Sequence, residues 1–430
     1  MSVLLANDCL IPAEHAARLV DPIAYSTGHI FQTYDWLREH QPLGVAHPEG
    51  FDPFWVVTRH ADVMEVSRDN RLYPYGERSS ILVDQFNDQR QREITGRPYF
   101  VRSLVQIDEP EHMALRQITQ PWFMPAVVAK RAQRIGVIAD ATVAKCQSLG
   151  AEIDFAHDVA LNYPLEVVMD ILGVPTADFG YMLKLTQETF GPTDPETSRL
   201  LEQATTAQIA EMSAAIVADF EQYFNVIADQ RRANPGDDLA SLIANAQVSG
   251  HPLTQEQQTG YFMIVATAGH DTTSSSTSGA MWALATQPGL LEQLQAEPAL
   301  IPAFVEESIR WTTPVRHFMR SPAQDTILGG RQLRQNDWLM LCYASANRDA
   351  AVFEDPYRFR LDRKVGHVAF GYGAHLCLGM HLARLEMRIL WEKLLPRIKH
   401  VEMNGDPQHV QATFVTGLKH LPIRWELRDQ

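Results

Sequence analysis

Cysteine is scarce in this sequence, and its scarcity excludes two common uses of the residue. Only four cysteines occur among 430 residues, far apart and without any C-x-x-C pair: Cys9, Cys146, Cys342 and Cys377. This spacing fits neither a disulfide framework nor a zinc ribbon, and it is typical of proteins from a reducing compartment. We therefore expect a cytoplasmic protein.

Long apolar runs and an excess of positive charge are also missing. No stretch approaches the roughly 20 apolar residues of a membrane-spanning helix, and the N-terminal segment lacks the basic start of a signal peptide. With 37 basic against 52 acidic residues, the formal net charge is −15. This balance argues against nucleic acid or an anionic membrane as the main partner. We expect a soluble protein with neither partner.

The sequence shows none of the usual marks of a domain boundary. No internal repeat, low-complexity tract or Gly/Ser-rich linker interrupts it, and helical periodicity dominates between residues 126 and 233. Strand patterns are fewer and come late, as in "DWLMLCYA" and the closing "TFVTGLKHLPIRWEL". We expect a mainly α fold with small β-sheets, in which residues 1–430 form a single domain.

One long helix is expected to cross this domain. Thr254 and Gln257 have the spacing of a capping box, and Pro288-Gly289 supplies a stop. The roughly thirty residues between these signals would span about 50 Å if they formed a straight helix.

The middle of this helix, "ATAGHDTTSSSTSG", is poor in good helix formers. Its hydroxyl groups compete for backbone carbonyls and bend helices. The pattern predicts a local opening of the helix or, alternatively, a loop between two shorter helices. Within it, Asp271 and Thr272 place a carboxylate next to a hydroxyl, a pair that can relay protons into an apolar cavity.

Two further pairs of polar residues each lie on one helix face. His112 and Arg116 are four residues apart and suit an anionic group, while Glu307 and Arg310 are three apart and suit an ion pair. An exposed pair of this kind contributes only about 0.2–0.5 kcal/mol. Taken alone, each pair is equally typical of a solvated helix surface.

One glycine-rich loop presents a cysteine directly before a helix. The stretch "FGYGAHLCLGM" places three glycines around Cys377, and "HLARLEMRILWEKLL" follows with helical periodicity. Helix N-termini and unpaired backbone N–H groups favour negative charge and lower the pKa of a thiol. A buried structural cysteine, our expectation for the other three, needs no such setting. We predict that Cys377 is a thiolate that binds a ligand.

Together and in this order, five motifs resemble the cytochrome P-450 haem-thiolate monooxygenases of the soluble bacterial type. The motifs are H-x-x-x-R (His112, Arg116), A-G-x-D-T (Ala268 to Thr272), E-x-x-R (Glu307, Arg310), P-x-R-F (Pro356, Arg358, Phe359) and F-G-x-G-x-H-x-C-x-G (Phe370 to Gly379). The resemblance covers essentially the whole chain, and the cysteine loop is its most specific part. Within the family, "ATAGHDTTSSS" and "GAHLCLGMHLARLEM" look most like the terpineol-hydroxylating enzymes.

The resemblance implies the cytochrome P-450 fold, with haem b held between the long central helix and the cysteine loop. Cys377 would be the metal ligand, a proximal thiolate that donates electron density to the iron and promotes O–O cleavage. Gly371 and Gly373 would let the loop pass close beneath the porphyrin. Gly379 would allow close packing where the next helix begins, and Phe370 would limit the access of water to the thiolate.

The two propionates of the haem would bind cationic partners. Four residues match the family positions for this role: His112, Arg116, Arg320 and His375. Arg316 lies close to Arg320 in "PVRHFMR" and is an alternative. The resemblance also implies a buried ionic network that supports the cysteine loop, formed by Glu307, Arg310 and Arg358.

On the opposite side of the haem, the resemblance implies the groups that handle oxygen and substrate. Gly269 would leave room for O2, Thr272 would hydrogen-bond to it, and Asp271 would pass protons inward from solvent. The substrate pocket would be lined by Ile264, Ala268, Val315, Phe318, Val415 and Thr416. Such a pocket suits a small lipophilic molecule, either a monoterpene alcohol or an aromatic hydrocarbon.

The implied reaction is hydroxylation of the substrate with O2 and two electrons. The sequence carries no flavin or nicotinamide fingerprint and no cysteine cluster for an iron–sulfur centre, so the electrons would come from a ferredoxin and its NADH-linked reductase. The expected docking face is a basic patch of Arg358, Arg360, Arg363 and Lys364. We expect a monomer. Two alternatives stay open: a peroxide-driven haem enzyme, and a haem protein that only binds or senses a ligand.

Overall fold

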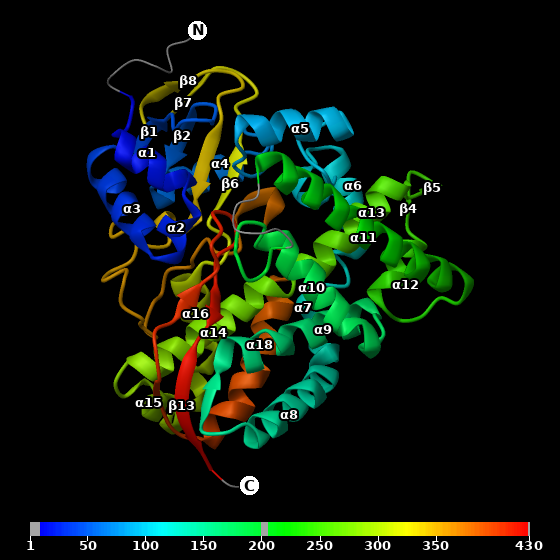
Figure 1. The fold of residues 1–430 in the computed structure, drawn as a ribbon, viewed down its shortest axis with the longest axis vertical. Helices are drawn as coiled ribbons and strands as arrows, with labels where there is room; N and C mark the ends of the chain where they lie inside the picture. The colour runs from blue at the N-terminus through cyan, green and yellow to red at the C-terminus, as the bar shows by residue number, and fades with distance from the viewer. Residues whose placement is uncertain (1–8, 199–204, 429–430) are drawn as a thin grey trace.

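Helices form the body of the molecule in the computed structural model, which describes residues 9–198 and 205–428 (Figure 1). The helices are α1 (Ala13–Val20), α2 (Pro22–Ser26), α3 (His29–His40), α4 (His60–Arg68), α5 (Gln85–Thr95), α6 (Glu111–Thr119), α7 (Pro125–Val128), α8 (Ala132–Ser148), α9 (Asn162–Leu172), α10 (Phe179–Phe190), α11 (Thr206–Ala233), α12 (Leu239–Ala244), α13 (Gln255–Ala268), α14 (Asp271–Thr286), α15 (Leu290–Ala296), α16 (Ile301–Thr312), α17 (Tyr343–Ala346) and α18 (Met380–Leu394). The mainly α class predicted from the sequence is confirmed.

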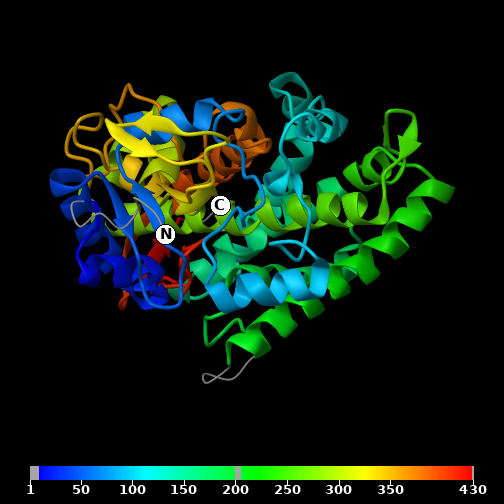
Figure 2. The same cartoon turned by 90° about the horizontal axis from the view of Figure 1, so that it is seen from above.

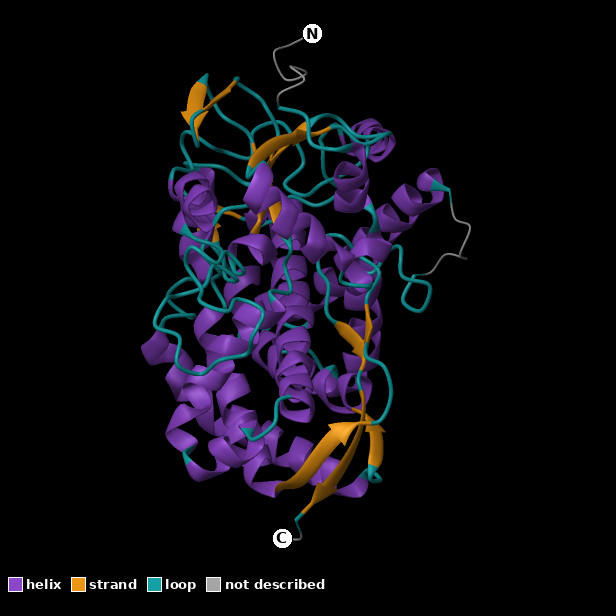
Figure 3. Cartoon of the chain, turned by 90° about the vertical axis from the view of Figure 1, so that its left-hand side faces the viewer, coloured by secondary structure: helices purple, strands orange, loops and turns teal. Residues whose placement is uncertain are grey.

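The strands form small sheets toward the two ends of the helical body (Figure 3). One sheet has the order β1-β2-β9-β6, and β2 and β9 are its parallel pair. Its strands are β1 (Leu43–Ala46), β2 (Phe54–Val57), β9 (Leu339–Cys342) and β6 (His317–Arg320). A second sheet contains β10 (Ile398–Met403), β13 (Pro422–Leu427) and β3 (Glu152–Asp154). Three two-stranded pairs complete the set: β4 (Gln247–Val248) with β5 (His251–Pro252), β7 (Thr326–Leu328) with β8 (Arg331–Leu333), and β11 (Gln408–His409) with β12 (Leu418–His420).

Burial on both faces explains why β2 is apolar without interruption. Side chains alternate between the two faces of a sheet. Phe54 and Val56 pack with residues of α1 and α3, whereas Trp55 and Val57 pack with residues of α4. The sheet is therefore held between two apolar layers, and this fixes the position of its edge strand β6.

The long helix predicted from the sequence is present as α13 and α14, which run across the molecule one after the other (Figure 2). The Thr254–Gln257 capping box begins α13 as expected. The helix opens only at Gly269 and His270, and both keep right-handed φ values of −77° and −93°. The prediction of a local opening is confirmed, since no loop separates the two helices.

Helix α18 follows the cysteine loop and packs on α8 and α16, while α14 also packs on α16. Its apolar side chains belong to the main core, which includes Leu385, Leu390 and Trp391. This packing fixes the start of α18 relative to the opening in the long helix. Nothing in these contacts tests the number of domains, so the single domain stays a prediction.

Candidate active site

The cysteine loop is held in a closed shape by backbone hydrogen bonds. The N–H of Cys377 donates to the carbonyl of Phe370 over 2.9 Å, and the N–H of Gly371 donates to Val368 over 2.9 Å. Gly371 and Gly373 have φ values of 70° and 76°, which other residues rarely adopt. The loop therefore depends on glycine at these two positions.

The space around Gly373 is a second constraint on this loop, whereas the close packing expected at Gly379 is not found. A Cβ on Gly373 would lie 2.1 Å from the carbonyl oxygen of Ser67 at the end of α4, so the loop passes close to α4. A Cβ on Gly379 would meet no protein atom within 4 Å. The expectation that Gly379 serves close packing within the protein is therefore wrong.

Cys377 is exposed, although other parts of the protein lie around it. Burial raises the pKa of its thiol above the ordinary value. Hydrogen bonds from the N–H groups of Gly379 and Met380, with the charges of Arg116 and Arg384, act in the opposite direction and only partly offset it. The sequence predicted a lowered pKa, which is wrong for the polypeptide alone because desolvation outweighs the helix N-terminus.

Four basic residues from three elements meet beside the loop, as the sequence predicted. His112 and Arg116 lie on α6, Arg320 lies on β6, and His375 lies in the 3-10 turn Gly373–His375. The rings of His112 and His375 are 4.0 Å apart between centroids. Arg320 stacks 3.7 Å above the ring of Tyr75, whose centroid is 5.0 Å from that of His375.

The described part of the chain supplies few hydrogen-bond acceptors to the donors of these four side chains. His112 Nε2 is buried and has no hydrogen-bond partner in the described part of the chain. Arg116 donates to the carbonyl of Leu376 over 2.6 Å, and Arg320 donates to the carbonyl of Met319 over 3.1 Å. Burial lowers the pKa of His375 to about 2, helped by the charges of Arg320, His112 and Arg116. The cluster therefore has donors to offer an anionic group.

Arg316 is not part of this cluster. It donates to the carbonyls of Thr312 and Thr416, over 2.8 Å and 3.3 Å, and lines a different cavity. Of the two arginines considered from the sequence, Arg320 is thus the one that lies with His375.

Across from the cysteine, the helix opening carries the second group of predicted residues. The side chain of Ala268 is exposed although it lies in the middle of the long helix. Thr272 donates its hydroxyl to the carbonyl of Ala268 over 2.8 Å. A Cβ on Gly269 would lie 2.5 Å from Cγ2 of Val168 on α9. Glycine at 269 therefore permits helix packing, and the room that it would leave for O2 stays a prediction.

His270 is a residue that the sequence analysis did not single out. Its Nε2 donates to the carbonyl of Leu161 over 2.8 Å, and its Nδ1 lies 3.1 Å from the hydroxyl of Thr186. That hydroxyl also lies 2.9 Å from the carbonyl of Leu183. The ring of His270 is therefore held by a carbonyl on one side and by a hydroxyl on the other.

The ring of His270 faces Asp271. Nδ1 of His270 lies 3.5 Å from Oδ2 of Asp271, and this carboxylate oxygen is buried without a hydrogen bond. Burial opposes the charged ring, but the Asp271 carboxylate and the Leu161 carbonyl outweigh it and raise the pKa of His270. The signal that the sequence offered was a histidine between two apolar runs. The structure shows that this histidine is fully buried.

The ionic network contains Glu307 and Arg310 as predicted, but its third member is different. Arg310 forms two bonds of 2.7 Å to the Glu307 carboxylate. Arg363 also donates to it, over 3.0 Å and 3.1 Å, and is only 10% exposed. Arg358 contributes its carbonyl oxygen, whereas its side chain is exposed. The prediction for the Arg358 guanidinium is therefore wrong, because the path of the chain brings Arg363 inward.

The same arrangement contradicts half of the predicted docking patch. Arg363 is buried in the network, and Arg360 is bound by Glu354, Asp355 and Asp362. Arg358 and Lys364 remain exposed. The segment before the cysteine loop is therefore not a basic patch of four free cations.

The predicted pocket residues divide into two groups. Ile264, Val315 and Phe318 are partly exposed, as is expected for residues beside a cavity. Val415 pairs with Val315 in an isolated β-bridge and is nearly buried. Thr416 is 0% exposed, and its hydroxyl donates to the carbonyl of Ala412 over 2.6 Å. Thr416 therefore lines no open space, and that prediction is wrong.

Comparison with known proteins identifies the class. Residues 198–427 match the family model described as Cytochrome P450. Cytochrome P450-terp of Pseudomonas sp is 44% identical over 417 residues, 96% of this chain and 97% of that protein. Linalool 8-monooxygenase of Pseudomonas putida is 30% identical over 411 residues, 94% of this chain and 98% of that protein. The crystal structure of CYP108D1 from Novosphingobium aromaticivorans DSM12444 has a TM-score of 0.89 at 43% identity, and the match covers 97% of this chain and 100% of that one. Fold and comparisons together define a haem-thiolate oxygenase.

The chain belongs to the cytochrome P450 family. It is a monooxygenase whose cofactor is haem b, which the enzymes of this family bind through a cysteine thiolate. The described residues fit that group, because the exposed Cys377 lies beside a cluster of basic side chains in which the buried Nε2 of His112 has no hydrogen-bond partner. None of the described helices has the length and apolar character needed to cross a bilayer. The cytoplasmic location stays a prediction.

Proposed function

We propose that this monooxygenase hydroxylates a small lipophilic alcohol of the monoterpene class, with electrons from a ferredoxin. The observation that carries the proposal is the 44% identity to cytochrome P450-terp over 96% of the chain. A second relative is named for linalool, which is itself a monoterpene alcohol. The apolar, partly exposed side chains of Ile264, Val315 and Phe318 suit such a substrate.

In this proposal Cys377 binds the haem iron, and four residues bind the propionates: His112, Arg116, Arg320 and His375. The buried Nε2 of His112, which has no hydrogen-bond partner in the described part of the chain, supports the assignment. Phe370 lies at the start of the cysteine loop, and the guanidinium of Arg384 lies 4.7 Å from the centroid of its ring. The haem supplies the oxidising chemistry, while the protein supplies orientation, protons and a dry pocket.

Proton delivery is assigned to Asp271 and Thr272, with His270 as a positioning residue. The Thr272 hydroxyl is bound to the Ala268 carbonyl at the helix opening, from which rotation about one bond aims it into the site. The Asp271 carboxylate lies one residue away and has an oxygen with no hydrogen-bond donor. His270 lies 3.5 Å from that carboxylate and orients it, and Thr186 and Leu161 in turn fix the ring of His270.

Electron transfer is proposed to occur from a ferredoxin that docks beside the cysteine loop. One exposed cation beside that loop is Arg68, whose guanidinium lies 5.8 Å from the ring centroid of Tyr372. Arg68 is exposed, as are Arg358 and Lys364. We propose these three residues as the docking cations, in place of the patch expected from the sequence.

The first test is an optical titration of the purified ferric holoprotein. The panel contains terpineol, linalool and biphenyl, each followed to saturation by the shift of the Soret band toward high spin. We expect tight shifts with the monoterpene alcohols. A shift with biphenyl alone would move the substrate to aromatic hydrocarbons.

Turnover then separates the proposal from the two alternatives. Product should form from the best ligand only when NADH, a ferredoxin and its reductase are all present, as measured by gas chromatography with mass spectrometry. Turnover with peroxide at a comparable rate in the absence of O2 would favour the peroxide-driven enzyme. Tight binding without any product under either condition would favour a ligand-binding protein.

A further inference from the structure

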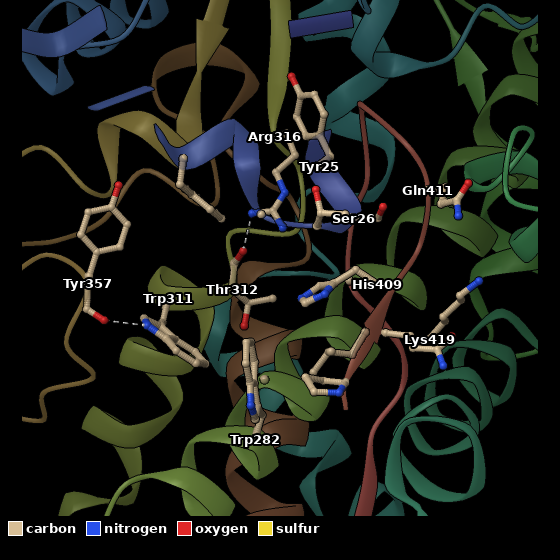
Figure 4. Close-up of a pocket in the computed structure, with 18 of the residues that line it drawn as sticks. Tyr25, Ser26, Trp282, Trp311, Thr312, Arg316, Tyr357, His409, Gln411 and Lys419 are labelled. Carbon is tan, nitrogen blue, oxygen red and sulfur yellow. Dashed lines mark hydrogen bonds between the residues drawn. The ribbon is translucent and has the colours of Figure 1, made fainter. Parts of the chain in front are cut away.

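A second cavity lies outside the site assigned to the haem. It has a volume of about 720 Å³ and is bounded by α2, α3, the C-terminal part of α14, the end of α16 and the β11–β12 pair (Figure 4). On α14 its wall includes Gly279, seven residues beyond Thr272, which corresponds to about 10 Å along the helix. Neither Cys377 nor the cluster around His375 lines it. The cavity is therefore separate from the haem site.

Two arginines line this cavity from the interior, Arg316 and Arg348. Each is only 5% exposed, and the Nε of each is buried without a hydrogen-bond partner. Both guanidinium groups lie over the ring of Phe31, 5.7 Å and 4.2 Å from its centroid. Figure 4 shows Arg316 pointing between Tyr25 and His409 toward the indole of Trp282. The two positive charges are thus neighbours on one side of the cavity.

No carboxylate neutralises this pair among residues 9–198 and 205–428. Arg316 and Arg348 donate only to backbone carbonyls, those of Thr312, Thr416, Trp311 and Ala344. Arg310, which is also buried, has the Glu307 carboxylate. Lys419 lines the cavity too, but it is bound by Asp194 and Glu196.

Both arginines nevertheless stay charged near neutral pH. Burial lowers the pKa of Arg316 to about 10 and, with the charge of Arg316 added, that of Arg348 to about 9. Two buried like charges without a counter-ion are unfavourable. An anion that enters the cavity would remove this cost.

Two tryptophans and a histidine give part of the remaining wall a flat, aromatic character. The rings of Trp282 and Trp311 are 5.0 Å apart, and the ring of His409 meets Trp282 edge-on at 5.8 Å. Burial lowers the pKa of His409 to about 4, so its ring is neutral near pH 7. A volume of this size and these walls accept a ring system as well as an anionic group.

We propose that this cavity binds a small organic anion, a carboxylate attached to a flat or cyclic hydrocarbon body. The carboxylate lies between Arg316 and Arg348, and the body packs against Trp282, Trp311 and His409. The proposal does not depend on the identity of the substrate at the haem.

The test uses 2-naphthoate as the probe and the ferric holoenzyme, with 4-phenylimidazole present to occupy the haem pocket. Isothermal titration calorimetry should give one site per chain, without a change in the Soret band. Methyl 2-naphthoate, which has the same body without the charge, should bind at least tenfold more weakly. Inorganic phosphate, which has charge without the body, should also bind at least tenfold more weakly. Equal binding of either compound would overturn the proposal.

Two variants and one control locate the site. Arg316→Gln should weaken 2-naphthoate at least tenfold while it raises the melting temperature of the anion-free protein, because it removes one of two unpaired buried charges. Trp282→Ala should weaken 2-naphthoate several-fold. Arg334→Gln removes an exposed arginine paired with Asp325 elsewhere on the surface, and it should change neither value. Unchanged affinity in both cavity variants, or no binding by the wild-type protein, would refute the proposal.

Discussion

Two groups of buried arginines in this protein look alike in sequence and differ in what accompanies them. Behind the cysteine loop, Arg310 and Arg363 share the Glu307 carboxylate and donate to backbone carbonyls, so each has an anionic partner within the chain. Beside the loop, Arg320 donates to the carbonyl of Met319 and stacks on the ring of Tyr75, and no described residue offers it a carboxylate.

The difference indicates what each group is for. A cation with an anionic partner in the chain holds segments together and needs nothing from outside, whereas a buried cation without a carboxylate gains stability when an anion arrives. By this criterion the cluster of Arg116 and Arg320 is built for a ligand, and so is the pair of Arg316 and Arg348. The predictions below test this distinction and the roles proposed at the site.

The largest effect is expected from Cys377→Ser. Loss of the thiolate removes the ligand proposed for the iron, so the absorption band typical of a thiolate-bound ferrous–CO complex should disappear and hydroxylation should be abolished. The measurement is the difference spectrum after dithionite and CO. A persisting thiolate spectrum would show that another cysteine is the ligand.

Glu307→Gln should leave Arg310 and Arg363 without their shared anionic partner. Removal of one partner from a buried network costs about 3–5 kcal/mol, so the free energy of unfolding measured with urea should fall by that amount and haem content should drop. The matched control is Glu306→Gln on the same helix. Glu306 pairs with Arg384 but is 43% exposed, so its loss should cost about 1 kcal/mol or less. Equal losses in the two variants would contradict the distinction.

Thr272→Ala tests the proton route. The variant should bind substrate with unchanged affinity and consume NADH, while the yield of product per NADH falls about tenfold or more and hydrogen peroxide appears. Ser276→Ala, which removes another hydroxyl of α14 that donates within the helix, serves as the control. An unchanged yield in Thr272→Ala would remove Thr272 from the route.

Arg320→Gln should do the opposite of Glu307→Gln. It removes a cation without a carboxylate partner, so the apoprotein should unfold at the same or a higher urea concentration. The holoprotein should release haem about tenfold faster, since a charge-assisted bond to the cofactor is lost. Haem transfer to apomyoglobin measures that rate, with Arg334→Gln as the control. Haem release at the wild-type rate would argue against Arg320 as a propionate partner.

The smallest effect is expected from His270→Asn, and it depends on pH. The pKa of His270 is raised in the folded protein, so its stabilising contribution is fully present below the ordinary value near 6.5 and is lost as the pH rises through the raised value. The variant should therefore lose about 1 kcal/mol at pH 6 and less at pH 9. The pH profile of product yield per NADH should shift as well. A loss of stability that is the same at every pH would leave His270 only a packing role.

Local patterns made much of this predictable from the sequence. The glycine-framed cysteine, the capping box at Thr254 and the run of hydroxyl residues around Thr272 each act within one or two helical turns, so their consequences are visible in the letters. The opening of the long helix and the start of α18 follow from them.

The errors concern contacts that depend on the tertiary path of the chain. Whether Arg358 or Arg363 turns inward is decided by the coil that precedes the cysteine loop, and no spacing in the sequence reports it. The contact of Gly269 with Val168, which the sequence does not report either, arises because α9 crosses the helix there. The raised pKa of Cys377 reflects desolvation in the folded protein, which a rule for helix N-termini does not include.

The hydrogen bond between Arg116 and the carbonyl of Leu376 joins residues that are 260 positions apart. The bond from Arg363 to Glu307 links residues 56 positions apart. Synthesis on the ribosome proceeds from the N-terminus. Neither contact can form until more than four fifths of the chain has been made. The nascent protein therefore lacks a complete pocket for most of its synthesis, and capture of the cofactor is confined to the end of translation or later.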